Sequence, residues 1–205
     1  MSNFHQNNPC CWDYDVCEYN ELGSISKEEE HLRNQLRLLW EQHIYWTRLT
    51  IIGIADDSPD LAFTTKRLLR NANDFALAFK PFYGTKAAGE FGELIKDHLV
   101  IAANLVKAAK AGNKKAAADA EKLWYENADQ IAYFLNRINC YWDLKEMTAM
   151  WHKHLALTKN EAVATLSGKY AESIALFDEI ENQALMMADM FTNGIIAQFP
   201  AMFAC

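Results

Sequence analysis

The chain has 205 residues, 51% of them hydrophobic, and a formal net charge of −7. This length suits one domain with tails, and the hydrophobic share is enough for a large core. We find no basic stripe, so nucleic acid is not an expected partner. Because no run of about 18 uncharged apolar residues occurs, the sequence predicts no membrane-spanning segment and no membrane partner.

The first 24 residues differ in composition from the rest of the chain. They contain four acidic residues and no lysine or arginine, and three of the five cysteines lie here: Cys10, Cys11 and Cys17. This start has neither the basic residues nor the apolar run of a secretory signal. The sequence therefore predicts a cysteine-containing arm over residues 1–24 and synthesis in the cytoplasm.

A helical pattern of apolar residues runs almost without interruption from Ser26 to Gln198. Turn-forming stretches interrupt it five times, at residues 55–60, 81–85, 111–113, 139–143 and 167–169. No alternating polar and apolar run indicates a strand. We therefore predict an all-α fold, a six-helix bundle over residues 25–198, followed by a tail over 199–205 that ends in Cys205.

The predicted helices fall into three similar pairs. Histidines recur after 55 and 56 residues, and each is followed 28 or 29 residues later by an asparagine. The pairs are His43 with Asn71, His98 with Asn127, and His154 with Asn182. This recurrence predicts three helical hairpins of about 55 residues, over about 26–82, 85–139 and 143–197.

Each histidine belongs to a mostly apolar helical face, so we expect all three to point into the core. Glu161 is the one charged residue on these faces. In the simplest interpretation the imidazoles are buried polar groups, since a buried ring needs hydrogen-bond partners. The paired asparagine would supply one partner, and a backbone carbonyl or the hydroxyl of Thr47 or Thr158 another.

A second interpretation is a metal site. If the hairpins pack around a common axis, His43, His98 and His154 converge, and three imidazoles suit zinc or another transition metal. Asn71, Asn127 and Asn182 would then orient the rings. A di-iron carboxylate centre is not expected, because the single Glu-x-x-His motif, Glu28 to His31, lies near a helix start.

No catalytic motif is present. The chain has neither a phosphate-binding glycine loop nor a Gly-x-Ser-x-Gly elbow, and no cysteine has a histidine base by sequence. The sequence therefore predicts a protein that is not an enzyme and needs no cofactor, unless the histidines bind a metal.

Several stretches resemble a known family: "LWEQHIYWTRLT", "TKRLLRN", "DHLVIAANLVKAAKAG", "WYENADQIA" and "FDEIENQALMMAD". Over about residues 33–200 the chain is similar to small helical-bundle proteins of spore-forming Gram-positive bacteria. Members often carry the names acetylglutamate kinase or glycosyltransferase, for which this sequence has neither the nucleotide-binding loop nor the strand–helix alternation. The resemblance implies a link to sporulation and no mechanism.

The terminal cysteines suggest a role in assembly. Cys10, Cys11, Cys17 and Cys205 lie in the two tails, and an odd total of five leaves one thiol over in a monomer. Reduced cytosolic thiols and a small zinc cluster are the alternatives. The sequence favours a structural protein that self-associates through intermolecular disulfides in a filament or a lattice. The resemblance to proteins of spore-forming bacteria implies deposition on the spore surface, or release by mother-cell lysis. The three-histidine binding site is the second hypothesis.

Overall fold

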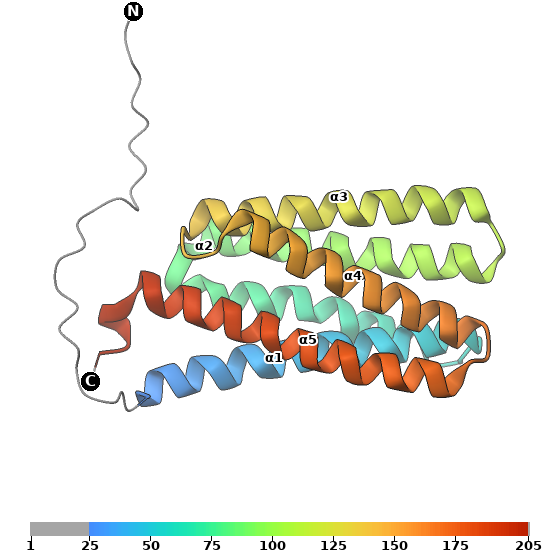
Figure 1. Cartoon of the computed structure of the whole chain (residues 1–205), viewed down its shortest axis with the longest axis horizontal. Helices are drawn as coiled ribbons and strands as arrows, with labels where there is room; N and C mark the ends of the chain where they lie inside the picture. The colour runs from blue at the N-terminus through green and yellow to red at the C-terminus, as the bar shows by residue number, and fades with distance from the viewer. Residues whose placement is uncertain (1–24, 205) are drawn as a thin grey trace, which may run out of the picture.

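The computed structural model describes residues 25–204, and all regular secondary structure in this part of the chain is helical. The predicted all-α class is therefore confirmed, with no strand in the described span. The cysteine arm and Cys205 lie outside it. Figure 1 shows a bundle of long helices with these bounds: α1 (Lys27–Ala55), α2 (Leu61–Lys110), α3 (Lys114–Ile138), α4 (Leu144–Leu166), α5 (Tyr170–Gln198) and the short 3₁₀ helix η1 (Pro200–Met202).

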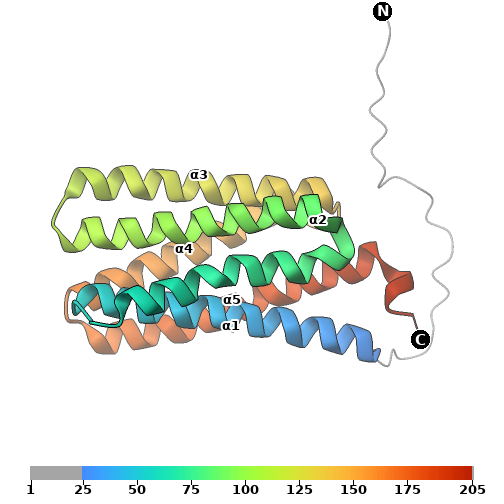
Figure 2. The same cartoon turned by 180° about the vertical axis from the view of Figure 1, so that it is seen from behind.

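The described residues form five α-helices where the sequence predicted six, and α2 accounts for the difference. The expected break at 81–85 is a sharp bend inside α2, which contains Pro81 and the positive φ of 73° at Gly84. Phe79 stacks on Phe91 with ring centroids 4.3 Å apart, whereas a straight helix would separate them by about 18 Å. The two halves of α2 therefore run side by side in opposite directions (Figures 1 and 2).

Local signals in the sequence fix several of the other helix ends. The hydroxyl of Ser26 accepts a hydrogen bond from the third residue of α1, and Asn113 and Asp143 cap α3 and α4 in the same way. Gly112 and Gly168 follow α2 and α4 with φ of 67° and 71°, a conformation that ends helices at little cost only for glycine. These turns keep consecutive helices antiparallel.

The core forms two groups of buried side chains. The larger group runs along the bundle and includes the fully buried Trp40, Phe75, Phe91, Trp151 and Phe191. The smaller group, which we call the end cluster, consists of Ile51, Ile54, Val106 and Ala162. It lies near the turns that follow α1, α2 and α4, at the end of the bundle away from η1 (Figure 1).

None of the helices in residues 25–204 combines the length and the apolar character that crossing a bilayer requires.

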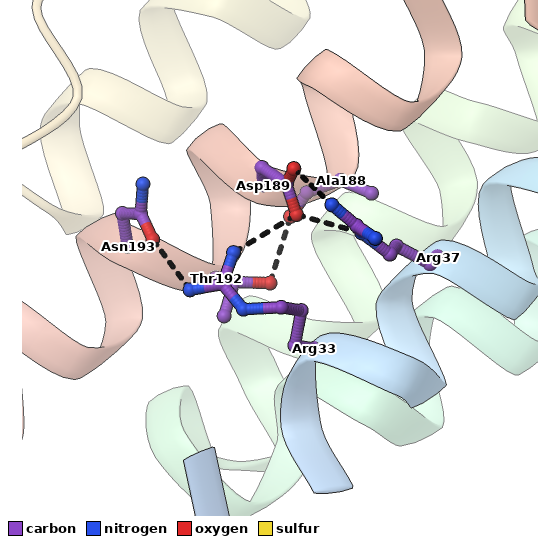
Figure 3. A network of polar contacts seen from close by, with 6 residues as sticks. All are labelled: Arg33, Arg37, Ala188, Asp189, Thr192 and Asn193. Carbon is purple, nitrogen blue, oxygen red and sulfur yellow. Dashed lines mark hydrogen bonds and ion pairs between the residues drawn. The ribbon is translucent and has the colours of Figure 1, made fainter. Parts of the chain in front are cut away.

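Helices α1 and α5 are joined by a polar network (Figure 3). Arg37 donates two hydrogen bonds to the carboxylate of Asp189, at 2.9 and 2.6 Å, and Arg33 donates a third at 3.0 Å. Arg33 also donates to Asn193 at 3.0 Å. These hydrogen bonds lower the pKa of Asp189, that from Arg37 most strongly. The network therefore holds the first and last long helices in register.

Candidate metal centre

His43, His98 and His154 meet in the middle of the core. They come from α1, the second half of α2, and α4, and each side chain is at most 2% exposed. Ring centroids lie 5.5 to 6.3 Å apart. One ring nitrogen of each histidine lies within 4.8 Å of those of the other two. Side chains 55 and 56 residues apart in the sequence thus form one cluster.

A buried amide from a neighbouring helix holds each ring. Nδ1 of His43 bonds Oδ1 of Asn71 at 2.9 Å, and Nδ1 of His98 bonds Oδ1 of Asn127 at 3.1 Å. For His154 the partner is Oε1 of Gln183, at 2.9 Å. The nitrogens of these amides donate at 3.0 to 3.1 Å to the carbonyls of Leu39, Leu94 and Met150, each four residues before the histidine concerned.

This arrangement fixes the tautomer of all three imidazoles. A backbone carbonyl can only accept, so the amide nitrogen must face it and the amide oxygen must face the histidine. That oxygen in turn requires a proton on Nδ1. Each neutral ring therefore keeps an unprotonated Nε2, whose lone pair is available as a metal ligand.

The rings remain neutral well below ordinary pH. Burial, followed by the nearby charge of His154, lowers the pKa of His43 to about 3. Burial also lowers the pKa of His154 to about 4. The pKa of His98 lies well below its usual value because of burial and of the other two rings. Protons therefore do not compete for these nitrogens near neutral pH, which favours metal binding.

Aromatic side chains surround the cluster. The Trp40 ring lies 5.2 Å from that of His43, and Trp124 and Trp151 lie 5.3 and 5.2 Å from His98. All three tryptophans are at most 2% exposed, and their indole N–H groups have no hydrogen-bond partner within residues 25–204. The rings therefore lie in an aromatic pocket that contains unpaired N–H donors.

No family model, curated protein or solved structure matches this chain. The chemistry of the cluster therefore has to be derived from its own geometry.

The prediction for the third amide was wrong. Asn182 is exposed and donates to the carbonyl of Asp178, while the fully buried Gln183 holds His154. A signal for Gln183 exists in the sequence, because each functional amide is directly followed by a buried alanine. The three dipeptides are Asn71-Ala72, Asn127-Ala128 and Gln183-Ala184. The predictions for Asn71 and Asn127 are confirmed.

The two threonines do not serve the rings as expected. Thr47 donates to the backbone carbonyl of His43 at 2.7 Å, as helical threonines commonly do. The hydroxyl of Thr158 is buried and has no partner among the described residues. Neither hydroxyl is therefore a hydrogen-bond partner of an imidazole.

The charged residue on the histidine face has its own partner. Glu161 is 1% exposed and is paired with Arg48, which also donates to the hydroxyl of Ser173 at 3.1 Å. Burial raises the pKa of Glu161 to about 7, although Arg48 acts in the opposite direction. The sequence offered no sign of this pairing, which spans 113 residues. Glu161 is not part of the three-histidine cluster.

The cross-link candidates Cys10, Cys11, Cys17 and Cys205 all lie outside the described residues. Cys140 is exposed in the turn between α3 and α4 and is disulfide-bonded. Self-association through terminal cysteines therefore stays a prediction.

Proposed function

We propose that this protein is a transition-metal-binding helical bundle, with Nε2 of His43, His98 and His154 as the ligands. One observation carries the proposal: three buried ring nitrogens lie within 4.8 Å of one another. The amides on Nδ1 support it, because metal-binding histidines characteristically donate their other N–H to a fixed acceptor.

A purely structural role accounts for the cluster less well. Packing alone requires a partner for each ring nitrogen, and the amides satisfy only Nδ1. With Nδ1 protonated, each ring has an Nε2 that can accept a hydrogen bond. One water molecule has only two hydrogens to donate, so it cannot satisfy all three rings. Trp40, Trp124 and Trp151 do not supply the missing donors, since their N–H groups are unpaired within the described residues. A single cation would satisfy three lone pairs at once.

The donor set indicates the class of metal. Three neutral imidazoles suit zinc, copper, nickel or iron, and disfavour magnesium and calcium, which prefer oxygen. Zinc binds imidazole nitrogen at about 2.0–2.1 Å, which brings three tetrahedral ligand nitrogens to about 3.3 Å from one another. The side chains would therefore close slightly around the ion. Three protein ligands leave a position for water or hydroxide, as in catalytic rather than structural zinc sites.

We further propose that the domain consists of three copies of one hairpin unit, each supplying one histidine and one amide. The hydrogen bonds support this division, because each His–amide pair joins two helical segments adjacent in the sequence. Their separations of 28, 29 and 29 residues are nearly equal. In this interpretation the bend at Gly84 is the boundary between two units within α2.

Metal analysis tests the proposal directly. Purified protein should contain, or take up from zinc sulfate, one metal ion per chain, and cobalt(II) should give the visible absorption of a tetrahedral site. His154→Ala should weaken zinc binding by at least about a hundredfold. His152→Ala is the matched control, because His152 lies partly exposed on the same helix and bonds Asp129. Failure to bind any of these metals stoichiometrically, or equal losses in the two variants, would overturn the proposal.

A further inference from the structure

A cavity of about 220 Å³ lies immediately beyond the histidine cluster. Thr47, Ala102 and Thr158 contribute to its wall, and each lies four residues, or one helical turn, after one of the three histidines. Trp124, whose ring lies 5.3 Å from that of His98, also lines it. The cavity thus begins one turn beyond the proposed metal site.

The cavity separates the two parts of the core. All four residues of the end cluster line it, and so do Leu99 and Leu105 of the larger group. Protein interiors are normally packed as densely as organic crystals, so a cavity of this size between two apolar groups departs from ordinary core packing. Its lining, mostly apolar with a few polar side chains, is typical of a small-molecule binding site.

Two buried polar groups in the wall lack partners. Within the described chain, the hydroxyl of Thr158 and the indole N–H of Trp124 make no hydrogen bond, although these residues are only 5% and 2% exposed. The other buried helical threonines differ from Thr158, since each donates to the carbonyl four residues earlier. They are Thr50, Thr165 and Thr192, with distances of 2.8 to 2.9 Å. Unpaired buried donors are costly unless a ligand satisfies them.

We propose that this cavity binds a small neutral organic molecule with an apolar body and one oxygen acceptor, such as a ketone, an aldehyde or an alcohol. The apolar wall would hold the body, and the hydroxyl of Thr158 would donate to the oxygen. No free charge is offered at the rim, because Lys159 and Glu121 pair with each other at 2.5 Å. Two lining residues, Ala109 and Val163, are exposed, so the cavity is open to solvent.

The volume limits the size of the ligand. An apolar cavity of about 150 Å³ accommodates benzene, so 220 Å³ suits a molecule of about ten non-hydrogen atoms. The binding proposal requires no metal, because the donor hydroxyl and the apolar wall belong to the protein.

Calorimetric titration of the full chain, stripped of metal by chelation, tests the inference with three probes of similar size. We expect 2-heptanone to bind, toluene to bind about threefold to tenfold more weakly because it has no acceptor, and heptanoate to bind least because it is charged. Thr158→Val should remove the preference for the ketone while leaving toluene binding unchanged. Thr192→Val is the matched control and should leave both affinities unchanged, since its hydroxyl already bonds Ala188.

A second variant tests the location. Ala162→Leu adds volume inside the cavity and should abolish binding of every probe, with helicity by circular dichroism showing that the chain still folds. Absence of ketone binding to the wild type, equal affinity for 2-heptanone and toluene, or an unchanged preference in Thr158→Val would overturn the proposal. Because the titrations use metal-free protein, failure of the metal proposal leaves their outcome unaffected.

Discussion

Asn71 holds His43 through both ends of its amide. Its oxygen accepts from Nδ1 of the ring at 2.9 Å, and its nitrogen donates at 3.0 Å to the carbonyl of Leu39, one turn before the histidine. The ring is thereby fixed to its own helix through a residue of the next one. Asn127 and Gln183 repeat this geometry, so the three imidazoles are oriented before any ligand arrives.

Replacing the third amide should weaken both the fold and the metal site. Gln183→Leu keeps a side chain of similar length but leaves Nδ1–H of His154 and the carbonyl of Met150 without their partner. We expect a loss of about 1–3 kcal/mol in the free energy of unfolding, and a tenfold to hundredfold weaker affinity for zinc. Urea unfolding and zinc titration measure the two effects.

Asn182→Leu provides the comparison for Gln183→Leu. Asn182 is the neighbouring residue on α5, but its side chain is exposed. Its replacement should change the unfolding free energy by less than about 0.5 kcal/mol and leave zinc affinity unaltered. Equal effects of the two substitutions would contradict the assignment of Gln183 as the amide that holds His154.

The sequence was sufficient to predict the inward histidines and two of their amides, because these depend on helical period and on the length of one hairpin. The prediction failed at Gln183 because aligning asparagine with asparagine across the repeats selects Asn182. Which of these two side chains is buried depends instead on its place on the helical face. In all three repeats the amide that holds the histidine is directly followed by a buried alanine, and this pattern identifies the correct residue. The break predicted over 81–85 falls where the backbone of α2 is non-helical, at Gly84.

Contacts between distant segments follow from the sequence only as conditional hypotheses, or not at all. The approach of His43, His98 and His154 to within 4.8 Å depends on how the helices pack, which repeat spacing does not determine. The pairing of Arg48 with Glu161, and that of Arg37 with Asp189 over 152 residues, likewise left no local pattern. The cavity depends on the same packing and on side chains from several helices.

Acidification should destabilise the metal-free protein through its histidines. An unfolded histidine takes up a proton below a pKa of about 6.5, whereas the folded pKa values of His43 and His154 are about 3 and about 4. Unfolding therefore binds protons in this window, and stability falls as the pH falls. Each group that takes up a proton on unfolding changes the free energy of unfolding by about 1.4 kcal/mol per pH unit. The three histidines together therefore lower it by up to about 4 kcal/mol per unit.

Glu161 has the opposite pH dependence. Its pKa is raised to about 7 from 4.5, so the folded state binds the extra proton between these values and stability rises as the pH falls. We would therefore measure urea unfolding at several pH values in a Glu161→Gln background. Adding His154→Leu to this background should reduce the dependence of the unfolding free energy on pH by the equivalent of about one proton. An unchanged pH dependence would contradict the buried, neutral state of this ring.

Gly194 should tolerate no side chain, because α5 passes directly against an indole. A Cβ at this position would lie 2.0 Å from Nε1 of Trp142, which donates to the carbonyl of Met190 at 3.0 Å. Trp142 is 1% exposed and cannot move away without disturbing the core. We expect Gly194→Ala to cost about 2–3 kcal/mol in thermal or urea unfolding.

Gly89→Ala is the control for Gly194→Ala. Gly89 is exposed in α2, and a Cβ there would meet nothing within 4 Å. The same substitution should stabilise the protein by about 0.5–1 kcal/mol, because alanine loses less backbone entropy in a helix. A destabilising Gly89→Ala, or a harmless Gly194→Ala, would show that the packing of α5 on Trp142 is wrong.

Removing the carboxylate that joins α1 to α5 should lower the stability of the bundle, and the size of this loss should depend on salt. Asp189→Asn keeps an acceptor but removes the charge that faces Arg33 and Arg37, so we expect a loss of about 1–2 kcal/mol at low ionic strength. The loss should shrink at about 1 M sodium chloride, because the Arg37 side chain is 43% exposed and salt screens such pairs. Asp119→Asn is the control, since Asp119 pairs only with exposed Lys115 in the described structure. Its effect should stay below about 0.5 kcal/mol at either salt concentration, and similar losses in both variants would mean that the Asp189 network contributes no more than a surface ion pair.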